Sequence, residues 1–249
     1  MKNNNLRKII FAGLMVATGI VLSNILSISY PPNSTIIRFG IGFLPLVIVS
    51  IVLGPKIGLY SAIVQDILGY FVYIWVFGVP SGPFFPGFTL NSILYGVVPG
   101  VVYNLRVSNK RFFGYVNYAL LFFLLISGIW SIIRVEEVIA LIENRLSEGM
   151  SFEPWVVYLM IGLGMLGVVS ILFYLYTKRN EAEEEQRIIF SVIFLQLLVA
   201  LILTPVWVSV LYKIPYLPQL PLRIIKTPVE IFFYSALLTR LIKVFKNRI

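Results

Sequence analysis

The chain has 249 residues, of which 59% are apolar and only 12% are charged, and its mean hydropathy is +0.91. These values lie far outside the averages of soluble domains and indicate an integral membrane protein, which we expect to form one domain over residues 1–249. The formal net charge of +9 does not indicate a nucleic-acid partner, because most of the cations gather on one side of the predicted membrane.

Several chemistries are excluded by missing residue types. Histidine and cysteine are both absent, so the chain lacks the usual zinc ligands and the usual base or thiol of a nucleophilic enzyme. Asp66 is the only aspartate, so the chain cannot form an aspartyl dyad from its own residues. No phosphate-binding P-loop motif is present. We therefore expect no enzyme, no metal and no cofactor, and any energy input must come from a partner.

The apolar residues form segments of about 20 residues, the length that crosses a bilayer as a helix. The first is retained as a helix, because no small-residue cleavage site follows it. The prediction is an all-α polytopic membrane bundle with eight crossings, at 7–28, 36–54, 56–77, 88–105, 113–134, 155–176, 188–212 and 222–243.

The charges predict the orientation of this bundle. When the helices are threaded alternately, 14 of the 20 cations fall on the side of the two termini, so the positive-inside rule places both termini in the cytoplasm. The remaining cations are nearly balanced by glutamates in a predicted external loop at 135–154. The mixed-sign run "KRNEAEEEQR" at 178–187 is interpreted as a solvated cytoplasmic turn.

Polar groups at membrane depth are the first candidates for a binding site. Gln65 and Asp66 lie in the third segment and Asn91 lies in the fourth. A buried carboxylate that receives N–H donors from a ligand would be well compensated, whereas one without partners is costly. Hydrogen bonding between helices is the alternative explanation for each of these residues.

The external loop "GVPSGPFFPGFTL" at 78–90 combines Phe84, Phe85 and Phe88 with several prolines. Because proline stiffens the backbone, these rings could form a preorganised wall for a flat heteroaromatic ligand. An interfacial aromatic belt is the alternative.

The last segment opens with two cations at the external face. Arg223 and Lys226 are three residues apart and Glu230 follows four residues later, so all three share one helical face. Together with the free N–H groups of a helix N-terminus, the two cations would form a site for an anion. The alternatives are that both cations reach to the interface, or that Lys226 pairs with Glu230.

Four stretches stand out together, at 13–23, 37–69, 85–100 and 207–230. Their most specific parts are P-G-F-T-L at 86–90 and R-x-I-K at 223–226. In this order the four stretches resemble the folate-specific substrate-binding subunits of energy-coupling factor (ECF) transporters.

This resemblance implies a six-helix core that captures a vitamin from outside a prokaryotic cell. Delivery follows docking onto a membrane coupling protein that is driven by two cytoplasmic ATPases. It also implies that the helix pair at 113–176 is inserted into the core. The positions that match the family's site are Arg38, Phe84, Phe85, Pro86, Gly87, Thr89, Arg223 and Lys226.

Within that site we expect Arg223 and Lys226 to bind the carboxylates of the ligand and the phenylalanine pair to bind its ring. Gly13 and Ala17 stand at the spacing of the family's small-residue motif, and either dock on the coupling protein or pack within the chain. The function predicted is high-affinity folate capture for transport. The alternatives are the same role for another flat anionic vitamin, or a membrane scaffold that transports nothing.

Overall fold

The computed structural model describes residues 2–24, 28–30, 37–78, 82–107, 109, 111–143, 153–177, 183–213, 215–216 and 219–246. These residues are almost entirely helical, with one short two-stranded sheet. The chain divides into two compact units, and each is described by itself. That residues 1–249 form a single domain, with 113–176 as an insertion, stays a prediction.

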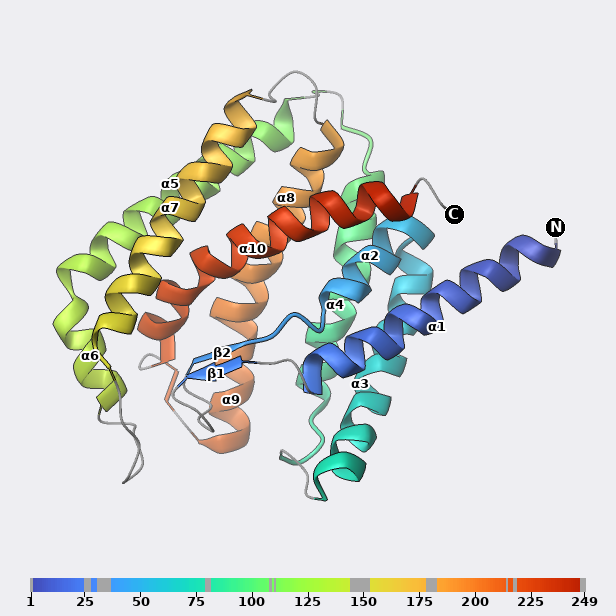
Figure 1. Ribbon diagram of the computed structural model, residues 1–249, viewed down its shortest axis with the longest axis horizontal. Coiled ribbons are helices and arrows are strands. Elements are labelled where there is room, and N and C mark those ends of the chain that lie inside the picture. Colours follow the sequence, from blue (N-terminus) through green and yellow to red (C-terminus); the bar gives the residue numbers. More distant parts are fainter. Residues whose placement is uncertain are drawn as a thin grey trace. The chain divides into compact units, whose positions relative to one another are not determined.

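The first unit contains four helices and the last turns of a fifth (Figure 1). Within it α3 contacts α1, α2 and α4, and α2 also contacts α1 and α4. The helices are α1 (Lys2–Asn24), α2 (Leu44–Leu53), α3 (Pro55–Phe77), α4 (Pro86–Asn104) and, from residue 237, the end of α10 (Leu220–Lys246).

Small residues let the helices of this unit approach closely. A Cβ atom built on Gly58 of α3 would lie 1.8 Å from the carbonyl oxygen of Gly96 in α4. A Cβ atom on Gly100 would lie 2.3 Å from the carbonyl oxygen of Ser50 in α2. The backbone N–H of Gly100 also donates a hydrogen bond of 2.9 Å to Ser50 Oγ. Close approach of this kind drives helix association in lipid, where the hydrophobic effect between helices is missing.

The second unit holds the sheet and the remaining helices. Strands β1 (Ile28–Tyr30) and β2 (Ile37–Phe39) pair antiparallel. Helices α5 (Phe112–Ile133) and α7 (Trp155–Thr177) pack side by side, and α6 (Val135–Glu143) contacts both (Figure 1). Helix α8 (Glu183–Leu195), the π-helix η1 (Gln196–Leu203) and α9 (Thr204–Tyr212) follow one another directly, and the unit also includes α10 up to residue 236.

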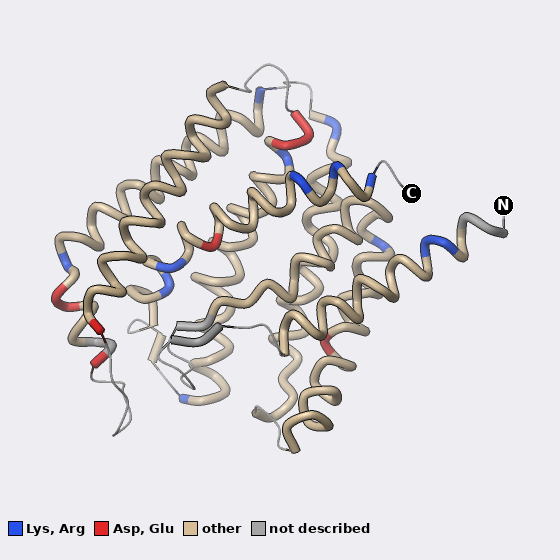
Figure 2. Tube along the Cα trace, viewed as in Figure 1, with Lys and Arg blue, Asp and Glu red and all other residues tan. Residues whose placement is uncertain are grey.

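Five helical stretches in the described part of the chain are long and apolar enough to cross a membrane. They are Asn5–Asn24, Pro55–Phe77, Phe112–Ile133, Trp155–Thr177 and Glu183–Tyr212. Charged residues lie mostly near helix ends, and long stretches of helix carry none (Figure 2). The prediction of a polytopic helical membrane protein is therefore confirmed.

The predicted crossing at 36–54 is wrong in extent. Its first part forms β2, and its helix α2 has only 10 residues, about 15 Å at 1.5 Å per residue. This is half of the thickness of the hydrocarbon core. The three residues of each strand run apolar, polar, apolar, which is the period of a strand and not of a helix.

Two stretches predicted to be solvated loops contain packed helix. Residues 135–143 of the predicted external loop form α6, whose Val135 and Val138 are buried. Residues 183–187 of the predicted cytoplasmic turn form the start of α8, where Arg187 is buried. Residues 144–152 and 178–182 of these loops lie outside the described residues.

Buried polar contacts explain why the start of α8 is helical and packed. Asn117 Nδ2 of α5 donates a hydrogen bond of 2.9 Å to the carbonyl oxygen of Gln186. Tyr174 of α7 donates its hydroxyl to the carboxylate of Glu185. The Arg187 guanidinium lies 5.0 Å from the centroid of the Phe113 ring. These contacts bind α8 to both α5 and α7, so polarity alone misled the prediction of a solvated turn.

Candidate functional site

The residues predicted to bind a ligand fall into two groups, one in each unit. The first unit carries Asp66 on α3 together with the loop before α4 and the first turns of α4. The second unit carries β2 and the first turns of α10.

Asp66 accepts hydrogen bonds from two hydroxyl groups of α4. Thr89 Oγ1 donates to Asp66 Oδ2 at 2.6 Å, and Ser92 Oγ donates to Asp66 Oδ1 at 3.3 Å. The carboxylate is half-buried. Since a carboxylate offers about four acceptor positions, these two bonds orient Asp66 and leave it able to accept further donors. The close crossing of α3 and α4 at Gly58 and Gly96 holds the two helices in this register.

Gln65 bonds to the turn before α2 and not to another helix, so the alternative of hydrogen bonding between helices is not what the structure shows for this residue. Its Nε2 donates to the carbonyl oxygen of Gly42 at 2.9 Å, in a buried bond. A Cβ atom on Gly19 of α1 would lie 2.1 Å from Gln65 Oε1, so the side chain lies directly against the α1 backbone. Asn91 is 8% exposed and is therefore among the buried polar residues of α4.

The aromatic loop enters α4 through Phe85, the residue before the first helical turn, and Pro86. Proline suits the first helical position, because its missing N–H would have no partner there. The ring of Phe84 packs edge-on against Tyr70 of α3 with centroids 5.4 Å apart. Phe85 packs edge-on against Phe88 at 5.9 Å. Phe84 and Phe85, the two phenylalanines predicted to bind the ring of the ligand, thus belong to separate aromatic pairs. Residues 79–81 lie outside the described part.

In the second unit, both cations of α10 contact the protein. Arg223 Nη1 donates to the carbonyl oxygen of Ala200 at 3.2 Å, and this carbonyl belongs to the π-helix η1. Lys226 Nζ lies 3.0 Å from Glu230 Oε1, and their side chains are 15% and 5% exposed. The structure therefore contains the ion pair between Lys226 and Glu230 that the sequence analysis gave as an alternative. Arg223 is half-buried and turns toward a helix of its own unit.

Arg38 lies on β2, opposite Ser29 of β1; its side chain lies outside the described part. The next residue, Phe39, extends toward α10, and Lys226 Nζ lies 5.9 Å from the centroid of its ring. A cation within about 6 Å of an aromatic face is attracted to it. The sheet therefore contributes to the surroundings of Lys226.

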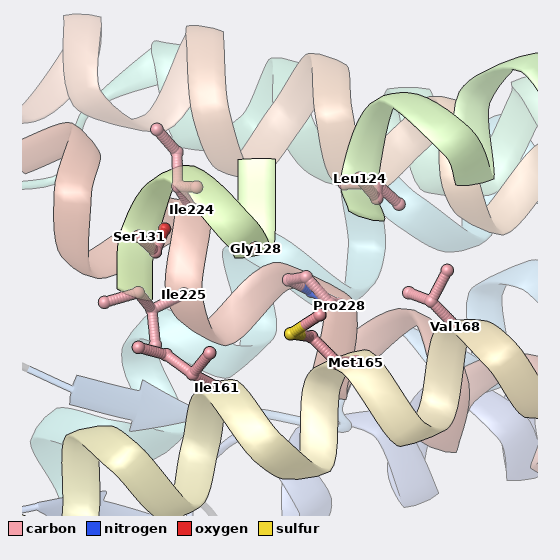
Figure 3. Close-up of a pocket in the computed structure, with 9 residues that line it drawn as sticks. All are labelled: Leu124, Gly128, Ser131, Ile161, Met165, Val168, Ile224, Ile225 and Pro228. Carbon is pink, nitrogen blue, oxygen red and sulfur yellow. The ribbon is translucent and has the colours of Figure 1, made fainter. Parts of the chain in front are cut away.

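A small apolar cavity in the second unit lies between α5, α7 and α10 (Figure 3). Its volume is about 10 Å³, which is barely enough for one water molecule. Gly128, Met165 and Pro228 are among its lining residues. Ser131, which also lines it, donates its hydroxyl to the carbonyl oxygen of Ser127. This cavity is too small and too apolar for a vitamin.

Gly13 and Ala17 of α1 are both exposed. A Cβ atom built on Gly13 would meet nothing within 4 Å. The small-residue motif therefore does not serve packing inside the first unit. No group of three or more acidic side chains suited to a metal ion occurs among the described residues.

Three residues of these surroundings were missed by sequence reasoning: Ser92, Tyr70 and Phe39. Ser92 lies three residues after Thr89 and therefore on the same helical face, a signal that was available. Tyr70 lies four residues after Asp66 and therefore on the same helical face, so its position could also have been inferred from the sequence. Phe39 could not have been found, because it depends on pairing between two strands and on their packing against a distant helix.

Comparisons with known proteins identify the family of this chain. A family described as "ECF transporter, substrate-specific component" matches residues 7–142, which is more than half of the chain. The folate transporter FolT of Clostridium novyi (strain NT) is 36% identical over 103 residues, which are 41% of this chain and 54% of that protein. The chain thus spans about half the length of this curated relative. No solved structure gives a significant match. The chain is therefore a multi-pass membrane protein that belongs to the substrate-specific components of ECF transporters, a family of transporter subunits and not of enzymes.

Proposed function

We propose that this protein captures folate, or a reduced folate, from outside the cell and delivers it across the membrane as the substrate-specific component of an ECF transporter. The observation that carries the proposal is the carboxylate of Asp66, held by Thr89 and Ser92 at membrane depth. Similarity to a folate transporter supports it.

Asp66 is suited to the pterin end of such a ligand. The pyrimidine edge of a pterin carries an amino group next to a ring N–H, which are two adjacent donors. A carboxylate accepts two such donors side by side, and bonds to a charged acceptor are worth about 1.5–3 kcal/mol. Phe84 and Phe85, with Pro86, Thr89 and Asn91 beside them, would line the ring, since offset aromatic contacts add about 0.5–1.5 kcal/mol.

Arg223 is the principal contact for the glutamate end of the ligand, with Lys226 and Arg38 adding positive charge. Arg223 donates to a neutral carbonyl at 3.2 Å, and a carboxylate is a stronger acceptor for a guanidinium than a carbonyl is. Lys226 already has the anionic partner Glu230, so its contribution to ligand binding is smaller.

Transport requires partners, and we assign them as the membrane coupling protein and two cytoplasmic ATPases of the ECF module. The exposed Gly13 and Ala17 on α1 are the proposed docking surface for the coupling protein, because small residues allow close approach of another helix. The excess of cations on the side of the termini supports a cytoplasmic location of both termini. With that orientation, Arg223 is reached from outside.

Equilibrium binding to the purified full chain in detergent tests the proposal. We expect folate to bind with sub-micromolar affinity and riboflavin, thiamine and biotin to bind far more weakly. Arg223→Ala and Asp66→Asn should each weaken folate binding by at least about 1.5 kcal/mol, roughly tenfold. Lys213→Ala is the matched control, because Lys213 is an exposed cation of the same unit and should leave affinity unchanged.

Two other results would reject the proposal. Affinity for a different vitamin, without affinity for folate, would identify another substrate for the same machinery. No affinity for any vitamin would favour a membrane scaffold whose polar residues only join helices.

A further inference from the structure

The first turns of α10 carry Arg223 and Lys226 and are separated from the rest of the helix by Pro228. Proline has no N–H to donate to the carbonyl four residues earlier, and its ring crowds that carbonyl, so the helix is weakest at this point. The direction of residues 220–227 is therefore not fixed by helix continuity alone. It depends on what packs against their sides.

Helices α6 and α7 supply that lateral packing. Leu222 and Ile225, the residues that directly precede Arg223 and Lys226, are 5% and 4% exposed. They belong to a buried apolar cluster whose other members come from α6 and α7: Val135, Val138, Val157, Met160 and Ile161. The two cations therefore sit on a helical segment whose neighbouring residues Leu222 and Ile225 are anchored in that cluster.

One turn further along, two glycines of α7 lie against side chains of α10. A Cβ atom on Gly164 would lie 3.1 Å from Cβ of Pro228 and 3.4 Å from Cγ2 of Val229. A Cβ atom on Gly167 would lie 2.7 Å from Cβ of Phe232. Nonbonded carbon atoms prefer about 3.5–4.0 Å. A Cβ atom at Gly167 would therefore force a shift, and one at Gly164 would require its neighbours to give by a few tenths of an ångström. Figure 3 shows α7 running beside the Pro228 turn of α10.

We propose that the helices within 113–176 are a positioning device for the anion end of the ligand site. They hold the first turns of α10 on the far side of Pro228 and so fix Arg223 and Lys226 in place. Gly164 and Ile161 are positioning residues in this proposal and do not contact the ligand. The inference rests on the proposed function, and it gives the predicted insertion a role in substrate affinity.

The test uses Gly164→Leu, which forces α7 and α10 apart at Pro228. Gly162→Leu is the matched control, because Gly162 is exposed on the same helix and a Cβ atom there meets nothing within 4 Å. Each full-length variant is titrated with folate and with folate diamide, in which both glutamate carboxylates are carboxamides. Amide hydrogen exchange of residues 220–227 is measured in the same samples without ligand.

We expect Gly164→Leu to weaken folate binding at least tenfold, to change diamide binding less than twofold, and to speed exchange of residues 220–227 at least threefold. Gly162→Leu should match the wild type in all three. If Gly164→Leu does not fold, Gly164→Ala with Ile161→Ala replaces it, with a selective loss of at least threefold expected.

An equal loss for both ligands, or unchanged affinity and exchange, would overturn the positioning role. Equal wild-type affinity for folate and its diamide would overturn it as well, since the cations would then not contact carboxylates. A wild type that binds no folate contradicts the proposed function instead. In that case the exchange measurement decides the positioning by itself: unchanged exchange rejects it, and selective acceleration in Gly164→Leu supports it.

Discussion

Breaking the ion pair between Lys226 and Glu230 should destabilise the protein more than removing both charges together. The two charged atoms are 3.0 Å apart, and the side chains are 15% and 5% exposed. Glu230→Leu leaves the ammonium buried without this partner. Lys226→Met with Glu230→Leu instead replaces the pair by two apolar side chains of similar length.

The expected magnitude follows from this geometry. At 3.0 Å and an effective dielectric constant of about 20, the attraction between two unit charges is about 5 kcal/mol. Removing one partner of a buried pair costs about 3–5 kcal/mol, because the other charge stays buried, whereas replacing both by apolar groups is often nearly neutral. For a chain of this size, a loss of about 3–5 kcal/mol lowers the melting temperature by roughly 10 °C.

Thermal unfolding in detergent, followed by circular dichroism, measures these differences. The exposed pair formed by Arg134 and Glu137, with side chains 51% and 62% exposed, is the control, and Arg134→Met should leave the melting temperature nearly unchanged. If Glu230→Leu alone lowers the melting temperature no more than the double variant does, the reasoning about a buried pair is refuted. Because the double variant should stay stable, its affinity for folate also shows whether the ammonium of Lys226 contributes to folate binding.

Two further predictions concern helix packing. Gly58→Ala should lower the melting temperature by about 2–12 °C, since overpacking costs about 1–3 kcal/mol and the new Cβ atom would lie 1.8 Å from the Gly96 carbonyl oxygen. Gly13→Ala should have no effect on the melt, and equal effects of the two would contradict the close crossing of α3 and α4. Asn117→Leu should lower the free energy of unfolding by about 1–3 kcal/mol, because Asn117 is fully buried and donates a hydrogen bond to the Gln186 carbonyl oxygen. An unchanged melting temperature would show that this hydrogen bond does not join α5 to α8.

Much of the candidate site could be predicted from residue type and spacing. Asp66 stood out because a lone carboxylate in an apolar segment is costly without partners, and the structure gives it two hydroxyl partners. Thr89 was included by resemblance to a family motif. The hydroxyl of Ser92 was missed, although its position three residues after Thr89 puts it on the same helical face.

The buried start of α8 shows where sequence reasoning fails. Glu185 and Arg187 looked like part of a solvated turn because single residues were judged by polarity. Both are buried, since Tyr174 hydrogen-bonds the glutamate and Phe113 lies against the arginine. Charged residues are buried only when partners compensate them. Arg187 pairs with Glu183 four residues earlier at 2.8 Å, but Tyr174 and Phe113 are about 11 and 74 residues away along the chain from the residues that they contact.

The sequence by itself determined that this is a helical membrane protein and which residues carry charge at depth. These properties depend on local composition, because a bilayer excludes unpaired backbone groups and charges wherever they occur. Only the tertiary structure decided that the segment at 37–53 begins as a strand and that α7 packs against the Pro228 turn of α10. Each of these depends on which distant backbones approach within contact distance, and no local pattern records that distance.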